Sequence, residues 1–387
     1  MAKLCPFRKA SWVPTPPDPD PEDPTFDPED GSWLWVTRPP YNATGNGTTD
    51  DRAAIQACIN AAASAGKKVY LPAGTYHMIA SGGTGLSIPS NTTIRGVGET
   101  SALQLYDDGT DDRNGLLDVA GKSNIAVKNL KLTGTQINKE ASVQLIWASG
   151  VQGLAISGVT FDKGEYALRT TTASPWASGI LVDGCTTLTG VLNPFYLSYC
   201  TNVTITDGNF EANRVDCIPT RWPHHFYVAG QVSGLMVSNC ILSGGQHWSI
   251  SLGDADSSST DLTFENILMT DITVAIHVSG YNGSLLLNGI TGSTTRYREG
   301  HPWLILYDAS GVTLRNFSFT GMASNNNWLV KSNNSSGNLL QDGIITNCTL
   351  LDHTPPGSEV VSGSAPVYDN VTVSATGSGG TVVNYTP

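Results

Sequence analysis

Acidic and histidine side chains that could cleave a glycosidic bond are concentrated between residues 211 and 254. Hydrolysis of such a bond needs one carboxyl group that protonates the leaving oxygen and a second that activates water or attacks the sugar. Glu211, Asp216 and Asp254 could supply these carboxyl groups if adjacent coils of a repeat bring them together. His247 could orient or tune one of them. These four residues are the predicted catalytic set.

Side chains that could bind sugar surround these candidates. Arg214 and Arg221 could form charge-assisted hydrogen bonds with an acidic sugar. Aromatic rings and hydroxyl groups on a flat face suit a pyranose ring, which has an apolar side and many hydroxyls. Alternation of apolar residues predicts an outward-facing set next to Trp248, made of His225, Tyr227, Ser249, Ser251, His277 and Tyr307. We predict that His225, Tyr227, Trp248, His277 and Tyr307 bind substrate; the alternative is an ordinary solvated β-face.

A repeat must position these residues. From about residue 124 a short unit recurs, in which apolar residues alternate and are followed by Asn, Asp or Gly at a turn. The apolar starts average roughly 27 residues apart, which is within the range of solenoid repeats. They are Ile125, Leu154, Ile180, Val203, Leu235, Leu262, Leu285, Val312 and Ile344, with a weaker copy of the unit at 284–288.

Further short strands recur with the same period, for example at residues 195–198, 226–228 and 250–252. Several short strands per repeat, stacked in register, make a β-helix. A leucine-rich repeat would need a different leucine pattern and a propeller a longer unit, so neither fits. The sequence therefore predicts an all-β solenoid, a single-stranded parallel β-helix, in which outward side chains form columns.

The N-terminal part carries a motif of known type. A G-x-G-x-x-D-D run at 45–51 is followed by an Ala-rich segment and by the sequence V-Y-L-P-A-G-T-Y at 69–76. Thr49 or Asp50 could cap a helix over about 50–65, with Ile55, Cys58, Ile59 and Ala62 on one face and Gly66 at its end.

This order of motifs resembles the N-terminal signature of the pectate-lyase superfamily, which is common in phage tail-spike and minor tail proteins. The resemblance covers about 36 residues. It implies a right-handed parallel β-helix whose first coil is covered by the helix, which would otherwise leave a strand edge open. Relatives of this type usually form parallel trimers, so the resemblance also implies a homotrimer.

The ends of the chain differ from its middle. Residues 1–40 are rich in Pro and Asp and predict a stiff tether or virion-attachment segment. Trp12, Trp33 and Trp35 flank it and could anchor it to a neighbouring protein or pack on the end of the domain. We predict the β-helix domain at 41–353 and closing strands at 354–387.

Composition excludes several partners. The net charge of −12 argues against nucleic acid and anionic membranes, because phosphate binding needs a basic face. No apolar run reaches membrane-spanning length, and the N-terminus has no signal-peptide pattern. The seven cysteines lack a CxxC spacing and predict small buried residues, with no metal site, no cofactor and no disulfide framework.

Two fragments resemble polygalacturonase motifs. Residues 216–218 match part of D-D-C-I, and 245–250 match part of G-H-G-x-S-I, although a single Asp precedes Cys217 and Gln246 replaces a glycine. No R-x-K follows, and the W-x-D-H and R-x-P-x-x-R motifs of calcium-dependent pectate lyases are missing. If the protein is an enzyme, the residues favour a glycoside hydrolase over a polysaccharide lyase.

Three functions remain open at this point. The first is a phage tail-spike or minor tail protein, located in the virion tail outside the cell, that binds and could cut host surface polysaccharide while its N-terminus holds other tail proteins. The second is a free polysaccharide hydrolase or lyase. The third is a purely structural tail component.

Overall fold

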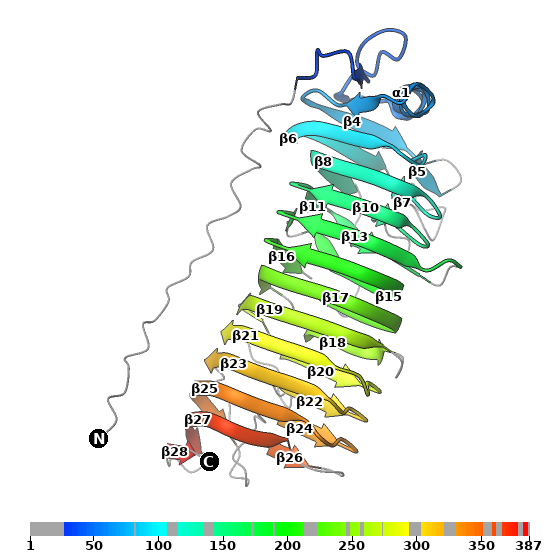
Figure 1. The fold of residues 1–387 in the computed structure, drawn as a ribbon. Coiled ribbons are helices and arrows are strands. Elements are labelled where there is room, and N and C mark those ends of the chain that lie inside the picture. Colours follow the sequence, from blue (N-terminus) through cyan, green and yellow to red (C-terminus); the bar gives the residue numbers. More distant parts are fainter. Residues whose placement is uncertain are drawn as a thin grey trace.

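The computed structural model describes most of the chain from residue 27 onwards. The described residues are 27–80, 83–106, 115–134, 143–171, 174–188, 190–212, 223–244, 248–255, 259–272, 274–293, 303–320, 330–350, 358–360, 366–377 and 382–385. They form one helix, α1 (Arg52–Ala65), and a stack of β-strands that runs along a single axis from α1 to β28 (Figure 1).

The strands before the middle of the chain are β1 (Trp33–Trp35), β2 (Asn46–Asp50), β3 (Lys68–Tyr70), β4 (Gly74–Ile79), β5 (Thr84–Ser87), β6 (Thr93–Tyr106), β7 (Gly115–Asp118), β8 (Ser123–Gly134), β9 (Gln144–Trp147), β10 (Gln152–Ser157), β11 (Thr160–Asp162), β12 (Gly164–Arg169), β13 (Ala177–Asp183) and β14 (Thr186–Thr187). Those that follow are β15 (Val191–Thr206), β16 (Asn209–Ala212), β17 (Phe226–Gly244), β18 (Trp248–Ala255), β19 (Thr260–Thr270), β20 (Val274–Ser279), β21 (Leu285–Ser293), β22 (Leu304–Tyr307), β23 (Val312–Thr320), β24 (Val330–Asn333), β25 (Leu339–Leu350), β26 (Ser358–Val360), β27 (Val367–Gly377) and β28 (Val382–Tyr385).

These strands form a right-handed parallel β-helix, as the repeat and the N-terminal motif predicted. Every strand except β28 pairs in parallel with a strand one coil away, so that Val203 lies beside Leu235 and Leu235 beside Leu262. The one antiparallel pair among the described strands joins β27 and β28 at the C-terminal end. The predicted weak repeat at 284–288 is a regular part of the stack, because β21 pairs with both β19 and β23.

The coil has three faces. The first face contains β10, β13 and the later part of β15; the second contains β11, β14 and β16; the third contains β9, β12, the first part of β15 and of β17, β18, β20 and β22. Long strands such as β17 bend round a corner and so belong to more than one face. The third face carries Tyr227, Trp248, His277 and Tyr307, which the sequence predicts to bind substrate.

Stacked apolar side chains fill the interior. Phe195 and Phe226 lie on adjacent rungs with ring centroids 5.0 Å apart and planes within 10°. Phe210 and Phe264 pack edge-on against Phe226 from other strands. Since all four rings are fully buried, this phenylalanine stack supports the part of the third face that lies outside it.

Asparagines shape the turn after the first face. Asn239 and Asn266 both have positive φ, 54° and 53°, a conformation that Asn tolerates better than most non-glycine residues. The Asn266 Nδ2 donates to Asn239 Oδ1 at 3.2 Å, which links one coil to the next. The recurring Asn and Gly of the sequence repeat therefore have a conformational reason.

Helix α1 covers the N-terminal end of the stack (Figure 1). Its buried residues are Ile55, Cys58, Ile59 and Ala62, as the periodicity predicted, and Gly66 ends it with φ +63°. Asp50 Oδ1 accepts a hydrogen bond from the amide of Arg52 at 3.1 Å, at the start of the helix.

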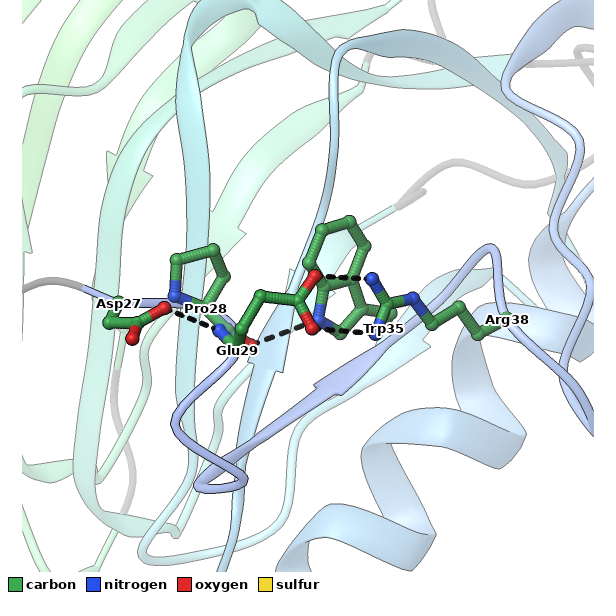
Figure 2. Close-up of polar contacts among 5 residues, drawn as sticks. All are labelled: Asp27, Pro28, Glu29, Trp35 and Arg38. Carbon is green, nitrogen blue, oxygen red and sulfur yellow. Dashed lines mark hydrogen bonds and ion pairs between the residues drawn. The ribbon is translucent and has the colours of Figure 1, made fainter.

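The segment before α1 packs on the first coil. Leu34 pairs with Val69, which adds β1 to the stack beside β3. Trp35 Nε1 donates to the Pro28 carbonyl at 3.0 Å, and Arg38 lies 3.7 Å over the Trp35 ring while it bonds Glu29 (Figure 2). The tryptophans were predicted either to anchor the segment to a neighbouring protein or to pack on the end of the domain. Trp35 packs on the end of the domain. Trp12 lies outside the described residues.

Candidate functional site

A column of side chains, most of them large, follows the third face from strand to strand. Strand register places one residue of each strand in this row, namely Trp147, Arg169, Tyr196, Tyr227, Ser251 and His277. Each alternates with buried core residues; Tyr227, for example, lies between the fully buried Phe226 and Val228. The period-two alternation of a strand therefore points the row away from the core.

The aromatic residues of this row and aromatic residues beside it form a continuous series of ring contacts. Tyr166 contacts Tyr196 with centroids 5.4 Å apart, and Tyr196 contacts Tyr227 at 5.3 Å. The ring of His224 comes next, with its centroid 5.1 Å from that of Tyr227 and 5.7 Å from that of Trp248. The series ends with His277, 3.8 Å from Trp248, and Tyr307, 6.1 Å from His277. We call these residues, together with Trp147, the aromatic ladder: Trp147, Tyr166, Tyr196, His224, Tyr227, Trp248, His277 and Tyr307.

The ladder suits a chain of sugars. Neighbouring rungs are about 4.8 Å apart, so a ladder from β9 to β22 offers ring contacts at regular intervals along the axis. Tyr166, Tyr196, Tyr227, Trp248 and Tyr307 are partly exposed. A partly exposed ring offers an apolar surface to the apolar side of a sugar, while Tyr hydroxyls can bond its hydroxyl groups.

Arg169 lies at one end of the ladder. Its Cζ is 5.5 Å from the Trp147 ring, 5.0 Å from that of Tyr166 and 5.1 Å from that of Tyr196. These distances place the guanidinium within cation–π range of three rings from β9, β12 and β15. The structure therefore holds one cation among aromatic side chains.

The histidine at the centre of the ladder is uncharged near neutral pH. Burial lowers the pKa of His224 to about 4, and its Nδ1 lies 3.2 Å from the Trp248 carbonyl oxygen. Since only 7% of His224 is exposed, it holds Tyr227 and Trp248 in place more than it offers its own ring to a ligand.

The structure brings together four of the predicted substrate-binding residues. Tyr227, Trp248, His277 and Tyr307 lie in one series of ring contacts. Their role in binding stays a prediction. His277 and Ser251, predicted to face outward, are nevertheless buried, and the Trp248 ring stacks on that of His277.

The expected exposure of His225 is wrong. Its side chain is fully buried, and its Nε2 lies 2.8 Å from the Ser243 carbonyl oxygen, at the corner between the second and third faces. At this corner two successive residues, His225 and Phe226, are buried, so simple alternation fails. Burial also lowers the pKa of His225 to about 4.

The predicted catalytic residues are described only in part. Glu211 lies on β16 in the second face, where its amide donates to Thr187 Oγ1 at 2.7 Å and its carbonyl oxygen accepts from the same hydroxyl. Asp254 lies on β18 in register with Ala229, and its side chain is not described. Asp216, His247, Arg214 and Arg221 lie outside the described residues. Their catalytic and binding roles stay predictions.

Sequence reasoning missed five members of this face: Trp147, Tyr166, Arg169, Tyr196 and His224. The sequence did contain a signal for Tyr196. The dipeptides Phe195-Tyr196 and Phe226-Tyr227 are separated by one repeat, and they pair directly in the structure. The strand at 143–146 was recognised as one of the recurring short strands, but its outward residue Trp147 and Arg169 on β12 were not predicted as part of the site.

A hollow of about 610 Å³ lies along the turn after the first face and is lined by Asp207, Asn239, Asn266 and Gly289, among others. The Asn266 amide is already bonded to Asn239 there. Because these side chains brace the turn between coils, we attribute a structural role to this hollow.

The described part of the chain contains no group of three metal-binding side chains. Cys58, Cys185, Cys200 and Cys240 are free in this part of the chain, and their burial confirms the prediction of small buried residues. Nor does any helix among these residues have the length and apolarity needed to cross a lipid bilayer.

Comparison with known proteins supports the fold assignment. Residues 39–107 match the family described as rhamnogalacturonase A/epimerase, pectate lyase-like. Mannuronan C5-epimerase AlgE1 of Azotobacter vinelandii is 34% identical over 171 residues, which is 37% of this chain and 12% of the epimerase. The chain thus covers only a small part of this relative's length.

Solved structures agree over a longer stretch. The A-module of mannuronan C-5 epimerase AlgE6 from Azotobacter vinelandii superposes with a TM-score of 0.63 at 18% identity, covering 88% of this chain and 99% of the module. A mutant tailspike protein of E. coli bacteriophage HK620, in complex with a pentasaccharide, has a TM-score of 0.63 at 13% identity and covers 88% of this chain and 65% of the tailspike. These likenesses show the fold, a parallel β-helix, and the match at residues 39–107 shows that this part of the chain is similar to a pectate lyase-like family.

Proposed function

We propose that this protein is a phage tail-spike or minor tail protein that binds host cell-surface polysaccharide along the aromatic ladder. The single observation that carries the proposal is the unbroken series of ring contacts from Tyr166 to Tyr307 along the parallel strands of the third face. Aromatic side chains on consecutive rungs suit a ligand that is itself a linear series of rings.

The comparisons support the carbohydrate part of this proposal. The β-helix is shared with a phage tailspike that was solved with a pentasaccharide and with the A-module of an epimerase named for mannuronan. The net charge of −12 disfavours nucleic acid as the ligand. Location in the virion tail, a homotrimeric assembly and attachment of the N-terminal segment to other tail proteins belong to the same proposal.

The test is binding of the full chain to purified bacterial capsular and lipopolysaccharide glycans, printed as an array and followed by titration of those that bind. Tyr227→Ala should weaken binding, while Tyr106→Ala, which removes an exposed ring from β6 outside the ladder, should leave it unchanged. An array without binders, or equal loss for both variants, would overturn the proposal.

A second candidate is a polysaccharide-cleaving enzyme, either free or as part of the tail. A relative named as an alginate lyase of Azotobacter vinelandii, 35% identical over 123 residues, favours it, and Asp216, Glu211 and Asp254 are the carboxylates predicted to act. Release of reducing ends or of unsaturated products from a bound glycan would reveal turnover. If Asp216→Asn abolishes release and leaves binding intact, the glycan is cut at this site; if no bound glycan is cut, the protein binds without cleaving.

A further inference from the structure

Arg169 differs from the rest of the ladder in charge. Among the described side chains of its register row, which runs from Asp118 through Trp147, Tyr196 and His277 to Ile305, it is the one permanently charged cation. Its row neighbour Asp118 is two rungs away and accepts a hydrogen bond from the amide of Ala120 at 2.9 Å. Arg169 can therefore attract a charged group of a ligand, which the uncharged rings of the later strands cannot do.

Arg169 also has no anionic partner among the described side chains. Its Nε is buried without a hydrogen-bond partner, and within the described part of the chain no carboxylate forms an ion pair with Arg169. Instead, three rings at 5.0–5.5 Å hold the side chain. A planar guanidinium held in this way loses little freedom when its N–H groups bind an anion.

We propose that Arg169 binds an anionic group on one sugar of the glycan, and that the neutral sugars beyond it lie over the rings from Tyr196 to Tyr307. This inference rests on the proposed function and adds the substrate class: a heteropolysaccharide in which carboxylated or phosphorylated sugars are separated by several neutral ones. Guanidinium recognises carboxylate and phosphate by the same paired N–H bonds.

The rest of the ladder argues against a densely charged polymer. A glycan with an anion on every sugar would place charges over Tyr227 and Trp248, where the ring contacts are made with the uncharged His224. Desolvating an anion without a partner is costly, and the net charge of −12 adds repulsion. A uniform polyuronate such as alginate should therefore bind more weakly than a glycan with spaced charges.

The first experiment leaves the protein unchanged and alters the ligand. Each array glycan that binds is presented in its native form, after chemical reduction of its carboxyl groups and after removal of phosphate with aqueous hydrogen fluoride. One of the two treatments should lower affinity roughly ten- to hundredfold, the loss typical of a hydrogen-bonded charge. Binding to the native form should also weaken as salt is added.

The second experiment alters the arginine. Arg169→Gln should lower affinity for the native glycan to that of wild type for the treated glycan, and should bind both forms equally. Arg169→Lys should fall between them, because it keeps the charge without the planar fork. Arg315→Gln is the matched control, because the substitution makes the same change in net charge. Arg315 lies on β23, outside the ladder, and its Nε donates a hydrogen bond to Asn288 Oδ1.

The outcomes separate the two proposals. If no glycan binds, the proposed function fails. If glycans bind but the treated forms bind as well as the native ones, or alginate binds best, polysaccharide binding stands and the role of Arg169 is wrong. Because the ligand treatments use wild-type protein, a variant that fails to fold cannot leave the inference undecided.

Discussion

The ring of Trp248 stacks on the ring of His277, with centroids 3.8 Å apart and planes 19° apart. The two residues lie on adjacent strands, β18 and β20, and no other contact between ladder rings is as close. The pair therefore forms a fixed apolar platform midway along the third face. A platform that is rigid before the ligand arrives loses little entropy on binding.

Trp248→Ala should weaken polysaccharide binding by about 1–2 kcal/mol, roughly tenfold, because it removes the largest ring of this platform. Trp248→Phe should retain most of the affinity, since a smaller ring still stacks. Titration of a bound glycan by calorimetry measures both. Affinity that is the same for wild type and for the alanine variant would show that the ligand does not contact this rung.

The phenylalanine stack beneath the ladder should dominate local stability. Phe226 is fully buried between Phe195 and Phe264, so Phe226→Ala should lower the free energy of unfolding by about 3–5 kcal/mol. Tyr227→Ala, one residue later and partly exposed, should cost clearly less. Urea unfolding followed by circular dichroism compares the two, and similar losses would argue against a tightly packed interior at this coil.

Two buried histidines should make stability depend on pH. Burial lowers the pKa of both His224 and His225 from 6.5 to about 4, so between these values the unfolded chain binds more protons than the folded one. The contribution of the two uncharged histidines to the free energy of unfolding is therefore complete above about pH 6.5, and it is lost as the pH falls towards 4. The melting temperature should fall across this window.

A variant separates this effect from that of the carboxylates, which also titrate in acid. His225→Gln removes one of the two groups and should flatten the fall in melting temperature between pH 6.5 and 4, even if it lowers stability at pH 7. A slope identical to that of wild type would mean that His225 does not titrate in this way.

The sequence predicted the fold better than the site. Strand alternation, the recurring Asn and Gly turns and the helix near residue 55 follow from local rules, and the structure confirms them. The ladder depends on register between coils. Tyr227 and His277 could be found because their strands repeat a clear pattern, whereas Arg169 became visible only when pairing placed it between Trp147 and Tyr196.

Corners limited the prediction in a different way. His225 follows the alternation of its strand in sequence, but the chain turns at this residue from the second face to the third. Its ring is directed to the Ser243 carbonyl oxygen instead of the surface. A pattern with period two cannot report a change of direction between two strands.

The Asp50-Asp51 pair of the N-terminal motif provides the last prediction. Asp51 is almost fully buried, and its carboxylate accepts hydrogen bonds from the amides of Thr44 and Gly45 at 2.6 and 2.8 Å. It therefore fixes the loop that leads into α1, although it begins the helix without a side-chain cap. Gly45 is needed in this loop, since its φ is +61° and a Cβ there would lie 3.0 Å from the Tyr76 ring.

Asp51→Ala should lower the free energy of unfolding by about 1–3 kcal/mol, because the two amides lose their acceptor. It should also speed hydrogen exchange at Thr44 and Gly45 more than at the distant phenylalanine stack. Asp50→Ala is the control: its Oδ1 accepts longer bonds from Arg52 and Ile79, at 3.1 and 3.3 Å, in an exposed setting, so its cost should be smaller. If the two substitutions cost the same, the loop is held mainly by packing, and the second aspartate of the motif has no special role in closing the first coil.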